Sequence, residues 1–485
     1  MLDKVIAATK SFVNSVRKGE RKKYGQFFTA ESSARFMASM FNIDMSLPEI
    51  NILDAGAGTG VLSIALIERL LTEGYQGEIT LTCYENDPKV MRVLAENLTI
   101  LKAYDNIRYR LSSDNYITTQ QFNRETSFVF DDRNSYHLVI GNPPYLKIGK
   151  DAPEAIAMQE VCHGAPNLYF LFMAMGIYNL AQGGELVYII PRSWTSGAYF
   201  GQFRKYLFRE CVIEHIHLFE SRDKVFDSDP VLQETMIVQV KKSDVQPSQI
   251  SITTSLSSDF TCLNKISIDY NKVVSENNYV YLVTNKEQET VMSRIGKLHE
   301  TLESLRMKMK TGLIVDFRTR EVLRDSPEDG ACPLFYAQHI RNGKVIWPQG
   351  RAGEYILTER QSYRQKNVNY LFVKRFTSKE ESRRLQCGVY LARDFCEYPY
   401  VSTHNKINFI ECESEFIAYG LYALFGSTLY DDYYRILNGS TQVNATEMNT
   451  IPIPGKKIIE WMGREMSLLE LSEENCNQIV NKWIR

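Results

Sequence analysis

A glycine-rich turn between an apolar segment and a helical one constrains the fold of this 485-residue chain most strongly. The apolar run Asn51–Asp54 leads into Gly56, Gly58 and Gly60, and residues 61–70 then have the apolar spacing of a helix. Glycine permits a tight strand-to-helix turn and lets the backbone approach a ligand closely. The pattern predicts a buried strand, a loop and a helix of an α/β sheet. The glycines alone leave the ligand open, because dinucleotide-binding enzymes also carry such a triplet.

Acidic residues follow the next two apolar segments. Ile79–Tyr84 ends at Glu85, and Ile107–Ser113 ends at Asp114. An acid at the end of the second strand of such a sheet is placed to accept both hydroxyl groups of a ribose. A carboxylate after the third strand could accept a hydrogen bond from an adenine amino group. The three segments together predict a binding site for an adenosine-containing ligand.

The tetrapeptide Asn142-Pro143-Pro144-Tyr145 follows a further apolar segment, Tyr136–Gly141. Two prolines fix their own φ and push the preceding residue into an extended conformation. The Asn142 side-chain oxygen and the Pro143 carbonyl can then point the same way and accept both hydrogens of a planar amino group. Tyr145 can stack on the ring that carries this group. The predicted catalytic residues are therefore Asn142, Pro143, Pro144 and Tyr145.

In this order the segments are the pieces of an S-adenosylmethionine site with a methyl acceptor beside it. The chain resembles the N6-adenine DNA methyltransferases of the gamma (TaqI-like) arrangement, and Gly25–Ala30 resembles the short N-terminal motif of that family. Ala30 stands where proline is usual, and Asn115 where an aromatic residue is usual. The resemblance implies an α/β, Rossmann-like methyltransferase domain with a mixed sheet. It also implies that S-adenosylmethionine is bound by Thr29, Asp54, Gly56, Gly58, Glu85, Asp114, Asn115 and Phe172.

The same resemblance implies how the target is held. A target adenine flipped out of duplex DNA would lie against Tyr145 and Phe226, because N6 is hidden inside the stacked duplex. Methyl transfer would be direct, without a covalent enzyme intermediate and without a metal. The geometry alone leaves cytosine N4 open, since its amino group has the same shape.

Segments of the C-terminal half resemble the PstI/BsuBI-type modification methylases. They are Lys310–Arg318, Val373–Arg384 and His404–Asn408, and a further segment, Asn438–Ala445, resembles adenine methylases more broadly. The resemblance implies an α+β target-recognition domain that binds double-stranded DNA at a short palindromic site. The Arg, Lys and Asn content suits contacts with phosphates and base edges. The candidates for DNA contact are Arg318, Lys374, Arg375, Arg383, Arg384, Asn405 and Asn408.

The length predicts two or three domains. We expect a catalytic domain over residues 1–245 with a helical N-terminal segment, a connector over 246–289, and a recognition domain over 290–485 that ends in one helix from Ile458. Net charge is only −2, but residues 301–410 carry 19 Lys and Arg against 12 Asp and Glu, an excess of seven that leaves −9 elsewhere. A basic block beside an acidic catalytic half is the charge distribution expected of a DNA-binding protein. A solvated basic face with no partner would give the same distribution.

Cysteine usage and hydropathy bear on the compartment. The nine cysteines form no C-x-x-C pair or Cys/His cluster, which argues against a zinc site or a disulfide framework. Reduced thiols in the cytoplasm fit best. The N-terminus does not read as a signal peptide, and no apolar run approaches membrane-span length. We expect a monomer, and a separate restriction endonuclease that acts on the same site is a candidate partner.

Two other functions use similar sequences. Asn-Pro-Pro-Tyr also serves methyltransferases that act on a protein glutamine amide or on RNA bases. Those enzymes are usually shorter and lack both the Phe28-Thr29 motif and a long basic C-terminal domain. The second alternative is a DNA-binding subunit without turnover, against which the intact series Asp54, Glu85 and Asn142 argues. A fused nuclease is not expected, because no residues are spare for one.

Overall fold

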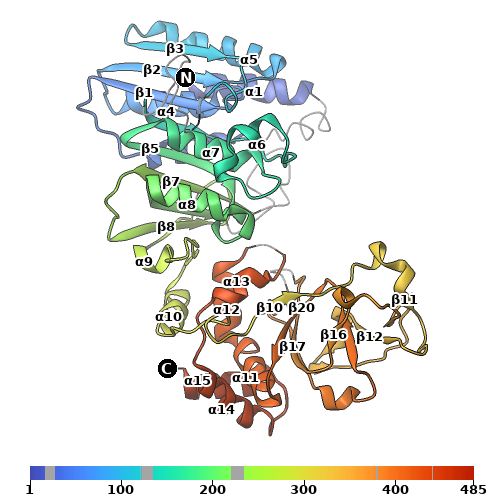
Figure 1. The fold of residues 1–485 in the computed structure, drawn as a ribbon. Helices are drawn as coiled ribbons and strands as arrows, with labels where there is room; N and C mark the ends of the chain where they lie inside the picture. The colour runs from blue at the N-terminus through green and yellow to red at the C-terminus, as the bar shows by residue number, and fades with distance from the viewer. Residues whose placement is uncertain are drawn as a thin grey trace. The chain divides into compact units, whose positions relative to one another are not determined.

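The computed structural model describes residues 1–16, 28–120, 122, 135–219, 234–260, 262–377, 381–439 and 441–484. The chain forms two compact units, Met1–Thr284 and Asn285–Arg485 (Figure 1). Each unit has its own sheets and its own helices, so each is described by itself.

Nine strands of the first unit form one mixed sheet in the order β3-β2-β1-β4-β5-β7-β6-β8-β9. Their bounds are β1 Glu49–Ala55, β2 Glu78–Tyr84, β3 Ile107–Ser112, β4 Tyr136–Gly141, β5 Leu180–Pro191, β6 Cys211–Phe219, β7 Thr235–Lys242, β8 Gln249–Ser255 and β9 Asn264–Asp269. Strands β3, β2, β1, β4 and β5 run parallel, while β7 is antiparallel to both β5 and β6. The strand order reverses between β1 and β4, which is where open α/β sheets bind their ligands.

Helices cover both faces of this sheet (Figure 1). They are α1 Leu2–Ser15, α3 Glu31–Met40, α4 Val61–Thr72, α5 Pro88–Leu98, α6 Pro153–Ala157, α7 Leu168–Asn179, α8 Gly201–Glu210 and α9 Tyr270–Val273. Successive strand residues point to opposite faces. Leu138 and Ile140 of β4 therefore share a core with α1, α3 and α4, whereas Val139 faces Gly176 of α7. The fold is the expected α/β class with a mixed sheet.

The end of the first unit differs from the expectation. The predicted connector over 246–289 contains β8 and β9, which extend the sheet, and the first unit continues to Thr284. Ile250 and Ile252 of β8 are fully buried. The Ser- and Thr-rich composition hid this, because Thr253 and Ser255 of β8 place their hydroxyls on the ring nitrogens of buried His217.

The second unit combines two small sheets with a group of helices. A six-stranded sheet has the order β10-β20-β17-β18-β14-β13, and a five-stranded sheet has the order β11-β15-β12-β19-β16. The strands are β10 Met309–Thr311, β11 Leu323–Arg324, β12 Cys332–Phe335, β13 Ile340–Arg341, β14 Gly343–Val345, β15 Tyr355–Ile356, β16 Gln365–Lys366, β17 Asn369–Lys374, β18 Cys387–Tyr390, β19 Tyr400–Thr403 and β20 Ile407–Cys412. The helices are α10 Lys286–Ile295, α11 Glu415–Phe425, α12 Thr428–Leu437, α13 Ala445–Thr450, α14 Lys456–Met466 and α15 Glu473–Trp483. Strands and helices are segregated along the chain, as in the expected α+β class.

The single C-terminal helix expected from Ile458 is wrong, because two helices, α14 and α15, occupy this stretch. Leu468 and Leu469 lie in the break, and Leu468 is 85% exposed. Ser472 then caps α15 by accepting a hydrogen bond from the backbone N–H of Asn475. A serine at this position favours a new helix start over continuation of the previous one.

Candidate active site

The glycine turn lies at the carboxyl end of β1 and has the conformation that only glycine adopts easily. Gly56, Gly58 and Gly60 all have positive φ, at 73°, 55° and 86°. The backbone N–H groups of Gly56 and Ala57 both donate to the carbonyl of Tyr84, at 2.9 Å. The turn is thereby attached to the end of β2, and a side chain at Gly56 or Gly58 would strain its backbone.

Two carboxylates are buried beside this turn. Asp54 is fully buried, and its Oδ2 accepts a hydrogen bond from the Ser63 hydroxyl at 2.5 Å. Glu85 is 9% exposed, and its two oxygens accept from the backbone N–H groups of Gly58 and Asp87 at 3.0 and 2.9 Å. Burial raises the pKa of both Asp54 and Glu85 to about 7. Asp54 Oδ1 has no hydrogen-bond partner in the described part of the chain, so it remains an unused acceptor at the base of the turn.

The acid after β3 is in a different environment. Asp114 is exposed, and its Oδ2 accepts from the Ser112 hydroxyl at 2.9 Å. The Asn115 amide is used within the protein, because it donates to Glu154 at 2.7 Å and accepts from the backbone N–H groups of Ile117 and Thr118. Asp114 therefore offers an accessible carboxylate, whereas Asn115 serves mainly to shape the turn.

The Asn142–Tyr145 loop leaves β4 at the same edge of the sheet. Gly141 ends the strand under the Tyr188 ring, which a Cβ at this position would approach to 2.8 Å. The Asn142 Nδ2 donates to the hydroxyl of buried Thr29 at 3.1 Å. Because the amide nitrogen is held in this way, the amide oxygen is fixed at the other end of the side chain.

Phe28 and Phe172 approach the glycine turn from two different parts of the chain. Phe28 lies 3.8 Å from the position that a Cβ on Gly58 would occupy, and Phe172 of α7 lies 3.5 Å from the same position on Gly56. The Phe172 ring also packs against the buried Tyr116 ring at 5.4 Å. The N-terminal segment and α7 thus both reach the loop that ends β1.

Tyr145 is anchored by its hydroxyl. The phenol donates to the carbonyl of Ile189 in β5 at 2.9 Å, and its ring lies edge-on to Tyr169. Burial of this hydroxyl raises the pKa of Tyr145 well above its usual value. The ring itself is half-buried, which leaves part of it accessible to a ligand. Phe226, the other expected contact of the target base, lies outside the described residues, as do Gly25, Gln26 and Phe27.

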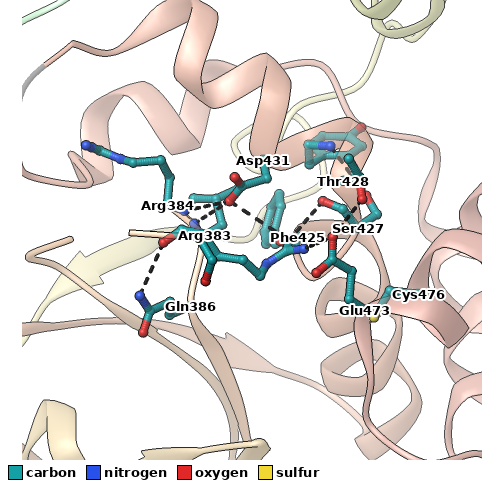
Figure 2. A network of polar contacts seen from close by, with 12 residues as sticks. Arg383, Arg384, Gln386, Phe425, Ser427, Thr428, Asp431, Glu473 and Cys476 are labelled. Carbon is teal, nitrogen blue, oxygen red and sulfur yellow. Dashed lines mark hydrogen bonds and ion pairs between the residues drawn. The ribbon is translucent and has the colours of Figure 1, made fainter. Parts of the chain in front are cut away.

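Three of the residues expected to contact DNA are internal to the second unit. Arg384 is 1% exposed and Asn408 is fully buried, where its amide bridges the Val443 carbonyl and the Thr311 hydroxyl. Arg383 is engaged by the carbonyl of Ser427 at 3.0 Å and the carboxylate of Glu473 at 2.9 Å (Figure 2). Arg384 and Asn408 are too deeply buried to contact DNA, so their assignment is wrong. Arg383 is half-buried and already engaged within the unit, so it is not carried forward as a DNA contact.

The remaining candidates are at least partly accessible. Arg318 is exposed, whereas Lys374, Arg375 and Asn405 are half-buried. Arg375 Nη1 donates to the Asn405 carbonyl at 3.2 Å, and the Asn405 N–H donates to the carbonyl of Ile314, which precedes Arg318 in the chain. These four residues remain candidates for DNA contact.

Sequence reasoning missed several contributors to the site. Ser63, the partner of Asp54, lies nine residues further along the chain, inside α4. Thr59, whose hydroxyl meets that of Thr9 at 2.7 Å, attaches α1 to the glycine turn. A hydroxyl on a buried helix face beside a buried acid is the signal that could have indicated Ser63.

In the described part of the chain, no helix combines the length and the apolar character that a membrane span needs. Within the same residues, no group of three or more His, Cys, Asp or Glu side chains could hold a metal ion.

The strand order, the glycine turn after β1 and the acid after β2 define the class as a Rossmann-like, S-adenosylmethionine-dependent type of methyltransferase fold. Residues 62–226 match the family model of the Eco57I restriction-modification methylase. The chain is 36% identical over 456 residues to the type II methyltransferase M.BsuBI of Bacillus subtilis, covering 92% of this chain and 90% of that one. It is 32% identical to the type II methyltransferase M.PstI of Providencia stuartii, covering 96% and 94%. The chain therefore belongs to the type II methyltransferases of restriction-modification systems, as its resemblance to the PstI/BsuBI-type enzymes indicated.

Solved structures agree on the fold. The type ISP restriction-modification enzyme LlaGI, solved as a nuclease-deletion mutant with a DNA substrate mimic, superposes with a TM-score of 0.54 at 13% identity. The match covers 92% of this chain and 55% of that one. The type IIL enzyme MmeI, solved in complex with DNA, gives a TM-score of 0.52 at 11% identity over all of this chain and 74% of that one. Both likenesses concern the fold alone.

Proposed function

We propose that this protein transfers a methyl group from S-adenosylmethionine to N6 of an adenine in a short duplex DNA site. The observation that carries the proposal is the Asn142–Tyr145 loop at the switch point of the sheet, next to the glycine turn, with the Asn142 amide held by Thr29. Membership of the type II methyltransferases supports DNA as the substrate.

The residues around the glycine turn fit the cofactor. Positive φ at Gly56 and Gly58 leaves the loop without side chains, so that a ligand could approach the backbone. Glu85 is held by two backbone N–H groups and keeps lone pairs for the ribose hydroxyls. Asp114 is exposed and could accept a hydrogen bond from the adenine amino group. The unused Asp54 Oδ1 could accept one from the positively charged amino group in the methionine part of the cofactor.

When bound, the cofactor supplies an electrophilic methyl group on a positive sulfonium. The protein must make the adenine nitrogen nucleophilic, because its lone pair is delocalised into the ring. The Asn142 oxygen and the Pro143 carbonyl would each accept one amino hydrogen and so localise electron density on the nitrogen. This stabilises the charge that develops in the transition state, and the fixed loop also aligns the nitrogen for transfer. After transfer the nitrogen is positively charged and carries two hydrogens, each still hydrogen-bonded to one of these acceptors. Neither acceptor is basic enough to keep a proton, so one hydrogen is lost as a proton to water.

The target base must leave the helix to reach this loop. Tyr145 suits a stacking role, because its hydroxyl is fixed on β5 while its ring stays partly accessible. Base–aromatic stacking is worth roughly 1–3 kcal/mol per base, which offsets much of the cost of unstacking. Phe226 is proposed as the second contact of the flipped base through the family resemblance.

Recognition of the DNA site is assigned to residues 290–455. Arg318, Lys374, Arg375 and Asn405 are its proposed contacts after the three internal residues are removed. One catalytic loop methylates one strand at each encounter, so a monomer suffices for a palindromic site. The setting we propose is the cytoplasm, with a separate endonuclease acting on the same sequence.

Mapping of modified bases in a host that expresses this protein tests the proposal. We expect N6-methyladenine at one position of one short sequence motif, and none with the Asn142→Ala variant. Modified cytosine at that motif would instead identify cytosine N4 as the acceptor. DNA with no modified base, together with methylated RNA or protein, would refute the assignment to DNA.

A further inference from the structure

A loop in the second unit, Trp347–Gly353, is folded around a buried carboxylate. Glu354 is 1% exposed, and its oxygens accept hydrogen bonds from the backbone N–H groups of Gln349 and Gly350 at 2.9–3.1 Å. Its Oε1 also lies 2.7 Å from Nε2 of buried His339. A buried carboxylate is costly unless it is paired and hydrogen-bonded, so these bonds hold the loop in one conformation.

The tautomer of His339 follows from its partners. The backbone N–H of Tyr336 donates to Nδ1 at 3.1 Å, so the proton of the neutral ring is on Nε2 and is donated to Glu354. Burial lowers the pKa of His339, which keeps the ring neutral. The histidine therefore acts as a fixed link between the loop and β12.

The loop carries a cluster of arginine and glutamine side chains. The Arg351 guanidinium lies 3.6 Å from the centre of the Tyr336 ring, and its Nη1 donates to Oε1 of exposed Gln338 at 3.4 Å. Arg341 donates to Oε1 of Gln349 at 2.9 Å. Stacking uses the face of a guanidinium and leaves its N–H edge for hydrogen bonds. These contacts hold the Arg351 guanidinium in position. They leave some of its N–H groups available to bind another molecule.

This cluster is connected to another candidate for DNA contact. The Tyr336 ring also lies against the His404 ring, with centroids 4.8 Å apart. His404 lies 3.5 Å from Asp316, which precedes exposed Phe317 and Arg318. Buried Tyr336 and His404 therefore connect the Arg351 cluster to the segment that carries Arg318.

We infer that Trp347–Gly353 is a base-reading loop, in which Arg351 contacts a base edge in the major groove with Gln338 beside it. The inference rests on the proposed function. Arginine binds O6 and N7 of guanine through two hydrogen bonds, and glutamine binds N6 and N7 of adenine. Such contacts need side chains held at a fixed position, which the Glu354 and Tyr336 contacts provide. Exposed Arg318 lacks this support and suits a phosphate, which positions the protein without reading sequence.

The full-length Arg351→Lys variant tests the role of the loop. It keeps the charge and loses the planar fork. Methylation rates are measured on the mapped wild-type site and on duplexes that each change one base pair. Discrimination is the ratio of the rate on the wild-type site to the rate on a changed duplex. We expect this ratio to fall roughly five- to hundredfold at one base pair and to stay unchanged at the others. Gln338→Leu, an exposed substitution, should relax a different base pair.

Two matched control variants separate a change in base discrimination from a general loss of DNA binding or activity. Arg464 of α14 also stacks on an aromatic ring, that of Phe416 at 4.4 Å, and Arg464→Lys should leave every ratio unchanged. Arg318→Ala should weaken binding of all duplexes alike and lower the salt slope by about one. Equal discrimination in Arg351→Lys and wild type, or an equal loss on all duplexes, overturns the base-reading role. A wild-type protein that methylates no duplex at all refutes the proposed function itself.

Discussion

At the scale of single residues, the site holds two carboxylates whose protonation depends on burial. Asp54 and Glu85 both have a pKa raised to about 7, because each is removed from water beside the glycine turn. Only the ionised form of Glu85 can accept both ribose hydroxyls. Cofactor binding and folding should therefore depend on pH in opposite directions.

The first prediction concerns this pH dependence. A carboxyl group with a raised pKa in the folded state keeps a proton that the unfolded chain releases near pH 4–4.5. Stability without cofactor should thus fall as the pH rises from about 4.5 to about 7, by about 1.4 kcal/mol for each unit of pKa difference. Cofactor affinity should rise over the same range. Thermal unfolding and binding titrations at pH 6 and pH 8 measure both effects.

Glu85→Gln is the matched variant for this prediction. Its unfolding temperature should change less between pH 6 and pH 8, because only Asp54 still titrates beside the turn. Its cofactor affinity should be at least tenfold weaker at pH 8, about 1.4 kcal/mol. A variant with the pH profile and the affinity of the wild type would show that Glu85 neither titrates there nor binds the cofactor.

The second prediction concerns Thr29. Its hydroxyl accepts the hydrogen bond that orients the Asn142 amide, so Thr29→Val should lower kcat about tenfold, which corresponds to about 1.4 kcal/mol of transition-state stabilisation. Thr29→Ser keeps the hydroxyl and should retain most activity. Steady-state kinetics with both variants measure this. A rise in KM for the cofactor with an unchanged kcat would mean that Thr29 serves binding only.

The glycine turn and the Asn142–Tyr145 loop could be predicted from sequence to lie at strand ends, because backbone constraints at glycine and proline are local. Arg384 and Asn408 could not be placed in this way. Residue type alone gives no sign that an arginine is buried in a network or that an asparagine bridges two segments. Burial of this kind depends on contacts between distant parts of the chain, such as Arg384 with Asp431.

At the scale of elements, one carboxylate holds α12 to the segment that precedes β18. Asp431 is 4% exposed, and its Oδ1 accepts from the backbone N–H groups of Arg384 and Leu385 at 2.8 Å (Figure 2). Its Oδ2 accepts from Arg435 at 2.9 Å. Loss of this group would leave buried donors without an acceptor.

The third prediction is that Asp431→Ala lowers the free energy of unfolding by about 3 kcal/mol, because a buried network is broken on one side. Asp432→Ala is the control, on the same helix and half-buried. Its effect should be small, since burial and the charge of Asp431 already raise the pKa of Asp432. Denaturant unfolding measures both variants. Equal losses in the two would argue that general helix stability, rather than the network, is responsible.

Element boundaries could be predicted where apolar periodicity was strong, as in β1, α4 and β4. They could not be predicted where the signal was a cap or a polar strand. The break between α14 and α15 depends on Ser472, and β8 carries threonines that face a buried histidine. Neither feature changes the apolar spacing on which the prediction rested.

At the scale of the whole molecule, the chain divides into a unit with the proposed cofactor site and a unit with the proposed recognition residues. The fourth prediction is that a chain ended after Thr284 binds the cofactor within about threefold of the full chain, since a threefold change is only about 0.7 kcal/mol. It should lose sequence-selective binding of DNA. Cofactor titration and competition between specific and non-specific duplexes measure this.

A shorter chain that ends at residue 245 serves as the comparison. It lacks β8 and β9, so it would expose the strand edge of β6 and remove the partners of His217. It should unfold at a lower temperature than the chain ended at Thr284. Site-selective methylation by either fragment would contradict the assignment of recognition to the second unit.

The central claim is that Asn142 presents an adenine amino group in duplex DNA for methylation. Purified protein is incubated with S-adenosylmethionine and unmodified duplex DNA, and the nucleosides are then identified by mass spectrometry. Wild type should yield N6-methyladenine, while Asn142→Ala should bind the cofactor as well as wild type and yield none. Product formation by Asn142→Ala at the rate of wild type, or methyl groups found only on another base, would contradict the claim.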